Sequence, residues 1–147
     1  MAKKSLESVE NKEQFLNDLE EWLKVEAKTR KQCSEIQKRT DNALVRMVAE
    51  IIRRDSKTHI EVLNLIRESL TEKAISLTPD DLAQIWDLVD GHREFEQKSI
   101  EMADRALRNS RIFVIRHLLT YMLEDESKHL KLLNQLEDFK RNLYPYL

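Results

Sequence analysis

One helical seam with two polar residues in its middle constrains this chain more than any other feature. Between residues 115 and 139, apolar residues recur at spacings of three and four, which places them on one face of an α-helix. The seam reads Ile115, Leu118, Met122, Asp125, His129, Leu132, Leu136 and Phe139. Burying a carboxylate and an imidazole is costly unless they are paired or bind a metal. The seam therefore predicts a core helix that carries a polar site.

Three other segments carry similar seams, so we expect an all-α protein. Helices are predicted over residues 11–37, 42–68, 79–107 and 110–142. The third begins at Thr78-Pro79-Asp80-Asp81, which combines a capping residue, a proline at the first position and acids against the helix dipole. Gly91 is the position at which we expect this helix to be weakened. Four helices of similar length, each with one apolar stripe, predict a single domain over residues 1–147 that folds as a four-helix bundle.

Composition excludes several classes of function. A formal charge of −2 over 147 residues provides no basic surface, so nucleic acid is not an expected partner. No apolar run approaches the roughly 20 residues of a membrane span, so we expect no membrane insertion. The polar segment after Met1 predicts no secretory signal. The single cysteine, Cys33, excludes an internal disulfide and a Cys-x-x-Cys metal site, which favours a reducing cytoplasm.

The chain repeats itself at an offset of 70 residues. The offset superimposes Glu26 on Glu96 and His59 on His129, and it keeps apolar positions in step. Further matched pairs are Lys28 and Lys98, Arg46 and Arg116, Asp55 and Asp125, Leu63 and Leu133, and Asn64 and Asn134. Each half is therefore predicted to be one helical hairpin with a glutamate on its first helix and a histidine on its second.

Two such hairpins pair most simply about a pseudo-two-fold axis, which would bring the polar seam positions to one level. That level holds five potential metal ligands: Glu26, His59, Glu96, Glu126 and His129. Carboxylates combined with neutral imidazoles suit iron, manganese or zinc. One Glu from each of two helices, with Glu-x-x-His from each of the other two, is a carboxylate-bridged di-metal pattern. The spacing of three in Glu-x-x-His lets both side chains reach one interior point.

On these residues the chain resembles the ferritin-like superfamily, in particular rubrerythrin-type four-helix proteins. Glu26-Ala-Lys-Thr-Arg30 is similar to the Glu-x-x-Ala-Arg segment of a rubrerythrin first helix, with Thr29 in place of the alanine. Glu96 fits the third-helix glutamate, and Glu126-Ser-Lys-His129 matches the fourth-helix motif. The resemblance covers about residues 11–142. It implies two duplicated hairpins around one or two iron ions, with manganese or zinc as alternatives, and it leaves open a homodimer.

The resemblance also implies an activity if the site is redox-active. That activity would be peroxide or dioxygen reduction, or the oxidation of ferrous iron. The chain has no rubredoxin-like cysteines, so an external reductant would be required.

The second helix departs from the family pattern. Ser56 stands where the resemblance implies a metal-bridging glutamate, so Asp55-Ser-Lys-Thr-His59 is a degenerate motif. Asp55 and Asp125 precede their histidines by four residues and would hold the imidazoles in the correct tautomer. Three arrangements stay open: one metal on Glu96, Glu126 and His129, two metals bridged by Glu126 alone, or no metal. His92, one turn before Glu96, is an alternative ligand.

Two alternatives concern the fold and the function. A ferritin-like connection over residues 69–78 would have to span about 38 Å along the helix axes, whereas ten extended residues reach about 33–36 Å. A simple up-down-up-down bundle would need only about 12 Å of axial travel. The alternative function is a non-catalytic helical bundle with a vestigial metal site that acts as an interaction or structural protein.

Overall fold

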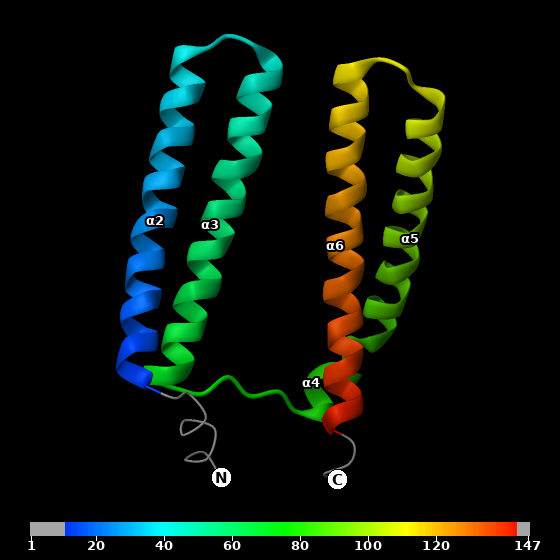
Figure 1. Ribbon diagram of the computed structural model, residues 1–147. Helices are drawn as coiled ribbons and strands as arrows, with labels where there is room; N and C mark the ends of the chain where they lie inside the picture. Colours follow the sequence, from blue (N-terminus) through cyan, green and yellow to red (C-terminus); the bar gives the residue numbers. More distant parts are fainter. Residues whose placement is uncertain (1–10, 144–147) are drawn as a thin grey trace. The chain divides into compact units, whose positions relative to one another are not determined.

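Residues 11–143 are described by a computed structural model, and within this range the chain forms helices and no strand (Figure 1). The all-α prediction is thereby confirmed. Contacts divide the chain into two units, Met1–Ile75 and Ser76–Leu147, each of which contains a helical hairpin. The tail Tyr144–Leu147 lies outside the described residues. No helix in the described range is long and apolar enough to cross a membrane.

The first unit is an antiparallel pair of helices, α2 (Lys12–Arg39) and α3 (Ala43–Thr71) (Figure 1). Asn11 and Asn42 cap them, each accepting a hydrogen bond from the backbone N–H three residues later at 3.1 Å. Such caps satisfy N–H groups that have no partner within the helix. The buried positions recur every seven residues on each helix. They are Leu19, Glu26 and Cys33 on α2, and Ala49, Ser56 and Leu63 on α3.

An arginine closes the turn of each hairpin in the same way. The Arg46 guanidinium donates to the carbonyl oxygens of Gln37 and Thr40, the latter at 3.4 Å. In the second unit, Arg116 donates to the carbonyl oxygens found 70 residues after those two, which belong to Leu107 and Ser110. The two turns therefore satisfy carbonyl groups at the end of the preceding helix by equivalent contacts.

The second unit contains α4 (Pro79–Ala83), α5 (Trp86–Asn109) and α6 (Phe113–Leu143). The prediction of one continuous helix over residues 79–107 is wrong, because the chain leaves the helical conformation at Ile85, with φ −117° and ψ 0°. The break accompanies the burial of Leu82, which is 2% exposed on a short helix that contacts α6. Gly91 does not interrupt the helix, since it lies within α5. Thr78 caps α4 reciprocally with Asp81, as its sequence predicts.

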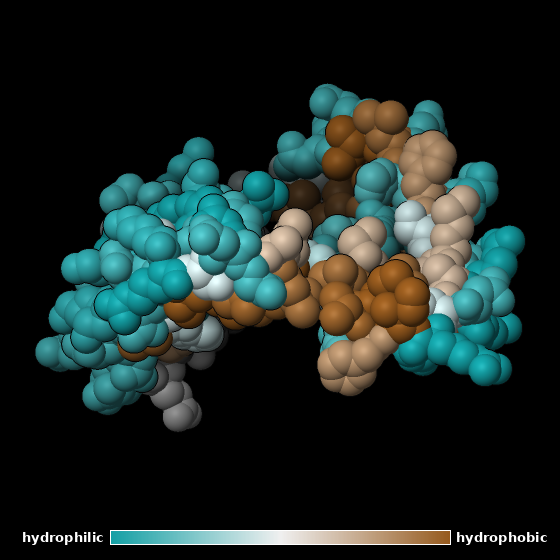
Figure 2. All heavy atoms as spheres, turned by 90° about the horizontal axis from the view of Figure 1, so that it is seen from above, coloured by the Kyte–Doolittle hydropathy of each residue, from teal (hydrophilic) through white to brown (hydrophobic). Residues whose placement is uncertain are grey.

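Each unit leaves large apolar side chains exposed, and Figure 2 shows hydrophobic residues at the surface among hydrophilic ones. In the first unit, Trp22 is 55% exposed and Val25 57% exposed. In the second, Leu88 and Phe113 are each 74% exposed. Two helices can bury only one stripe of each between them, so the remaining apolar positions of the seams face outward.

Candidate metal site

Glu96, Glu126 and His129 form the one cluster of three or more potential metal ligands found within residues 11–143. Glu96 comes from α5, and the other two residues lie one turn apart on α6. One ligand atom from each lies within 4.8 Å of the others. His129 Nδ1 is 3.4 Å from Glu96 Oε1 and 3.7 Å from Glu126 Oε2. The cluster therefore presents two carboxylates and one imidazole nitrogen to a common point.

Glu96 is the most deeply buried member, with 7% of its side chain exposed. Its Oε1 atom lies near two histidine nitrogens, His92 Nε2 at 2.9 Å and His129 Nδ1 at 3.4 Å. Its Oε2 atom is buried and has no hydrogen-bonding partner in the described part of the chain. A buried polar atom left without a partner costs about 1–3 kcal/mol, and more when it is charged. A bound cation or a carboxyl proton would remove this cost.

The carboxyl groups of Glu96 and Glu126 influence each other's pKa. The two carboxyl groups are close enough to share a proton, which lowers the pKa of Glu96 and raises the pKa of Glu126. Burial and the negative charge of Glu96 raise the pKa of Glu126 further. This pattern is that of two adjacent carboxyls that resist being ionised together. A divalent cation bound between them would replace the shared proton and compensate both charges.

Asp125 orients the histidine of the cluster. Its Oδ2 atom lies 3.3 Å from His129 Nε2, on the ring nitrogen that faces away from Glu96. If Nε2 carries the proton and donates it to Asp125, the Nδ1 lone pair is free to bind a metal. Asp55 is placed differently, since it is exposed and makes no hydrogen bond or ion pair with His59 in the described range.

The first unit has a glutamate at the corresponding place, but donors surround it. Glu26 is 8% exposed, and Trp22 Nε1 donates to its Oε1 atom at 3.2 Å. His59 Nδ1 lies 3.2 Å from the same oxygen, and the buried Ser56 hydroxyl also donates to Glu26. Burial raises the pKa of Glu26, but the hydrogen bonds from Ser56, His59 and Trp22 outweigh it and hold the pKa below its ordinary value. Glu26 is therefore a carboxylate satisfied by protein groups.

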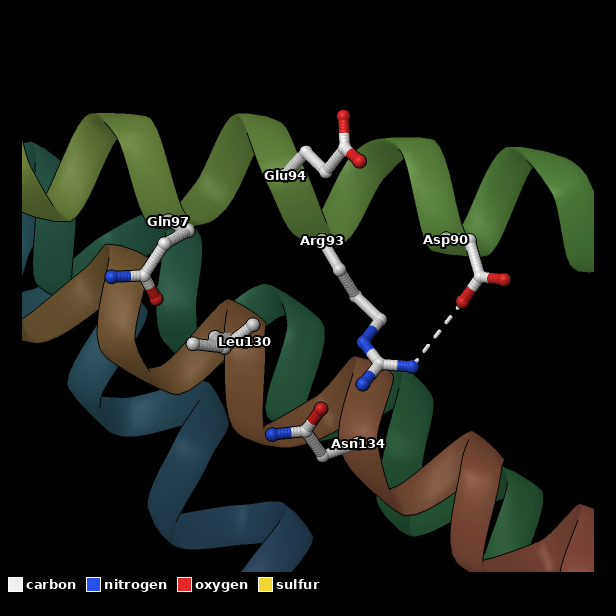
Figure 3. A pocket seen from close by; sticks show the side chains of 6 residues that line it. All are labelled: Asp90, Arg93, Glu94, Gln97, Leu130 and Asn134. Carbon is white, nitrogen blue, oxygen red and sulfur yellow. Dashed lines mark hydrogen bonds and ion pairs between the residues drawn. The ribbon is translucent and has the colours of Figure 1, made fainter.

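Several shallow grooves lie along the second unit, and two of them have at least four polar residues in their lining. One exposes the cluster and is lined by His92, Glu96, Glu126, His129, Leu132 and Leu133. The other is drawn in Figure 3, where the Arg93 side chain extends from α5 toward Asn134 on α6. Arg93 forms ion pairs with Asp90 at 3.3 Å and with Glu137 at 3.1 Å, so its charge is compensated within the protein. Only the first groove combines access from the surface with a set of metal ligands.

The five predicted ligands thus fall into two groups, each within one unit. Glu96, Glu126 and His129 meet in the second unit, and Glu26 and His59 meet in the first. Sequence reasoning missed the contact of Trp22 with Glu26. The repeat carried a signal for it, because Trp22 and His92 are 70 residues apart and each precedes a buried glutamate by four.

No protein-family model, curated protein or solved structure matches this chain. The geometry of the cluster is therefore the basis for a proposed function.

Proposed function

We propose that this chain is a ferritin-like metal-binding protein whose ligands include Glu96, Glu126 and His129. The observation that carries the proposal is the buried Glu96 Oε2 atom, which lacks a hydrogen-bonding partner in the described range beside a second carboxylate and an imidazole. Carboxylate oxygens and an imidazole nitrogen are hard-to-borderline donors that suit iron, manganese and zinc. The residues present therefore fit a divalent cation, and iron is the ion we favour.

The proposal extends to a ferritin-like fold, but it leaves Glu26 and His59 out of the ligand set, because they are hydrogen-bonded to each other and Glu26 also accepts from Trp22. The exposed apolar seam residues support it, because a bundle would remove them from water at about 25 cal/mol for each Å² buried. Each hairpin alone leaves Trp22 or Phe95 more than half exposed.

A bound iron ion would supply redox chemistry toward peroxide, dioxygen or ferrous iron. The protein's own residues would hold the ion and orient its ligands. Glu96 and Glu126 provide negative charge from two facing helices, and Asp125 fixes the His129 ring. The open groove gives small molecules access to the cluster. The single free cysteine, Cys33, is buried, which fits the proposed cytoplasmic location.

A second candidate function is a non-catalytic bundle whose surface binds a protein partner. It is favoured by the exposed apolar residues Leu88 and Phe113, since exposed apolar patches often mark interaction surfaces. Under this function the cluster would be a remnant, and replacement of His129 would cost no more than ordinary packing.

Elemental analysis of the protein produced in iron-supplemented medium distinguishes the two functions. We expect close to stoichiometric metal in the wild type and its loss in His129→Ala. The matched control is His117→Ala, which removes an exposed histidine of the same helix outside the cluster. If wild type retains less than about a tenth of an equivalent of any transition metal, and cannot be reconstituted with iron, manganese or zinc, the metal-binding function is wrong.

A further inference from the structure

We propose, on the basis of the metal-binding function above, that the site takes a single ion within the Ser76–Leu147 unit and that His92 is its fourth protein ligand. In the Met1–Ile75 unit, Trp22 and Ser56 replace the corresponding ligands with hydrogen-bond donors and keep Glu26 metal-free.

His92 is placed as a ligand would be. It lies on α5 one turn before Glu96, and its Nε2 atom is 2.9 Å from Glu96 Oε1. His129 Nδ1 approaches the same oxygen from α6 at 3.4 Å. Neighbouring ligands held about 2.1 Å from an ion are about 3.0 Å apart in octahedral geometry and about 3.4 Å apart in tetrahedral geometry. The two imidazoles therefore lie at ligand-like distances from one Glu96 oxygen. His92 lies outside the group formed by Glu96, Glu126 and His129, so its exposed ring would turn toward the ion on binding.

The groove supports the same assignment. His92 lines it together with Glu96, Glu126 and His129, so all four side chains border one hollow. The His92 ring stands edge-on to Phe95, with centroids 6.3 Å apart, and 57% of the side chain is exposed. An ion could therefore enter from the surface without a change in the helices.

The repeat shows what replaces these ligands in the first unit. Trp22 corresponds to His92, and Ser56 corresponds to Glu126. An indole N–H is a donor with no lone pair to offer a metal. Trp22 and Ser56 both donate to Glu26, whose carboxylate is thus paired, whereas its counterpart Glu96 keeps an oxygen without a partner in the described range.

This difference argues against Glu26 as a ligand. An ion on Glu26 would displace donors that already bind it, and a hydrogen bond to a charged group contributes about 1.5–3 kcal/mol. An ion on Glu96 displaces the His92 contact at Oε1, but the Oε2 atom is open to an ion without loss of a hydrogen bond. Metal binding is therefore favoured in the second unit and opposed in the first.

The test is titration of the metal-free full-length protein with Zn²⁺, Mn²⁺ and, without oxygen, Fe²⁺, followed by calorimetry. We expect one equivalent in wild type and at least a tenfold weaker affinity in His92→Ala. His117→Ala, Glu26→Gln and His59→Ala should stay within about twofold of wild type. Because His92 borders an open groove, added imidazole should restore much of the affinity of His92→Ala, which loss of packing alone would not allow.

The possible results distinguish the role of His92 and the confinement to one unit from metal binding itself. Wild type that binds no ion overturns both. Wild type that binds one ion, with His92→Ala unchanged, overturns the role of His92 and leaves the metal-binding function intact. A second equivalent that disappears in Glu26→Gln or His59→Ala overturns the confinement to one unit.

Discussion

Replacement of Glu96 by Gln should destabilise the metal-loaded protein far more than the metal-free protein. Without metal, the change removes one of two carboxyl groups that lie within 4.8 Å of each other. Two unit charges at that separation repel by about 3.5 kcal/mol at an effective dielectric constant of about 20. A proton on Glu126 relieves this repulsion, and the lowered pKa of Glu96 means that its neighbours favour the carboxylate. The metal-free Glu96→Gln variant should therefore gain no stability and should lose only the contacts with His92 and His129.

With metal, the variant should lose much more stability. A ligand present at 100 times its dissociation constant stabilises the folded state by about 2.7 kcal/mol. Glu96→Gln should lose this stabilisation, because an amide is a weaker ligand than a carboxylate. For a unit of this size, 1 kcal/mol moves the melting temperature by about 4–8 °C, so the metal-induced shift should fall by roughly 10 °C or more.

The assay is thermal unfolding followed by circular dichroism, with chelator and with saturating metal. Glu94→Gln is the matched control, because it removes an exposed carboxylate from the same helix and should change either melting curve by less than about 0.5 kcal/mol. If Glu96→Gln lowers both melting temperatures equally, Glu96 is a structural hydrogen-bonding residue and our account of the cluster is refuted.

Ser56→Glu should lower the melting temperature of the metal-free protein, because it places a second carboxylate beside Glu26. The same substitution should raise the metal stoichiometry above that of wild type. An unchanged stoichiometry in elemental analysis would contradict this prediction. The pKa of Glu126 is raised, so its contribution to stability is present below the ordinary carboxyl pKa and is lost as pH rises through the raised value. Between those two values metal binding should release a proton, measurable by calorimetry in buffers of different ionisation enthalpy, and Glu126→Gln should abolish the release. Leu63→Ala should lower the free energy of unfolding, measured by chemical denaturation, by about 2–5 kcal/mol, because Leu63 is 3% exposed. Val62→Ala should lower it far less, because Val62 is 49% exposed. Similar losses in the two variants would show that Leu63 is not a core residue.

Local patterns in the sequence determined the helices well. The ends of α2 and α3 depend on the capping residues Asn11 and Asn42 and on spacings of three and four, which are properties of neighbouring residues. The sequence also predicted that Glu126 and His129 lie next to each other, because residues three apart share one face of a helix. The repeat also located the buried glutamates, because Glu26 and Glu96 occupy equivalent seam positions.

Only the tertiary structure decided how each glutamate is satisfied. The partners of Glu26 are donors from its own helix and from α3, and those of Glu96 include a second carboxylate from α6. The break in the helix at Ile85 could not be predicted either, because the residues on both sides of it favour helix. It accompanies the burial of Leu82 on α4, which contacts α6, and such packing depends on the tertiary structure. Sequence periodicity reports which face a residue occupies, whereas the choice of hydrogen-bonding partner depends on side chains that only packing brings together.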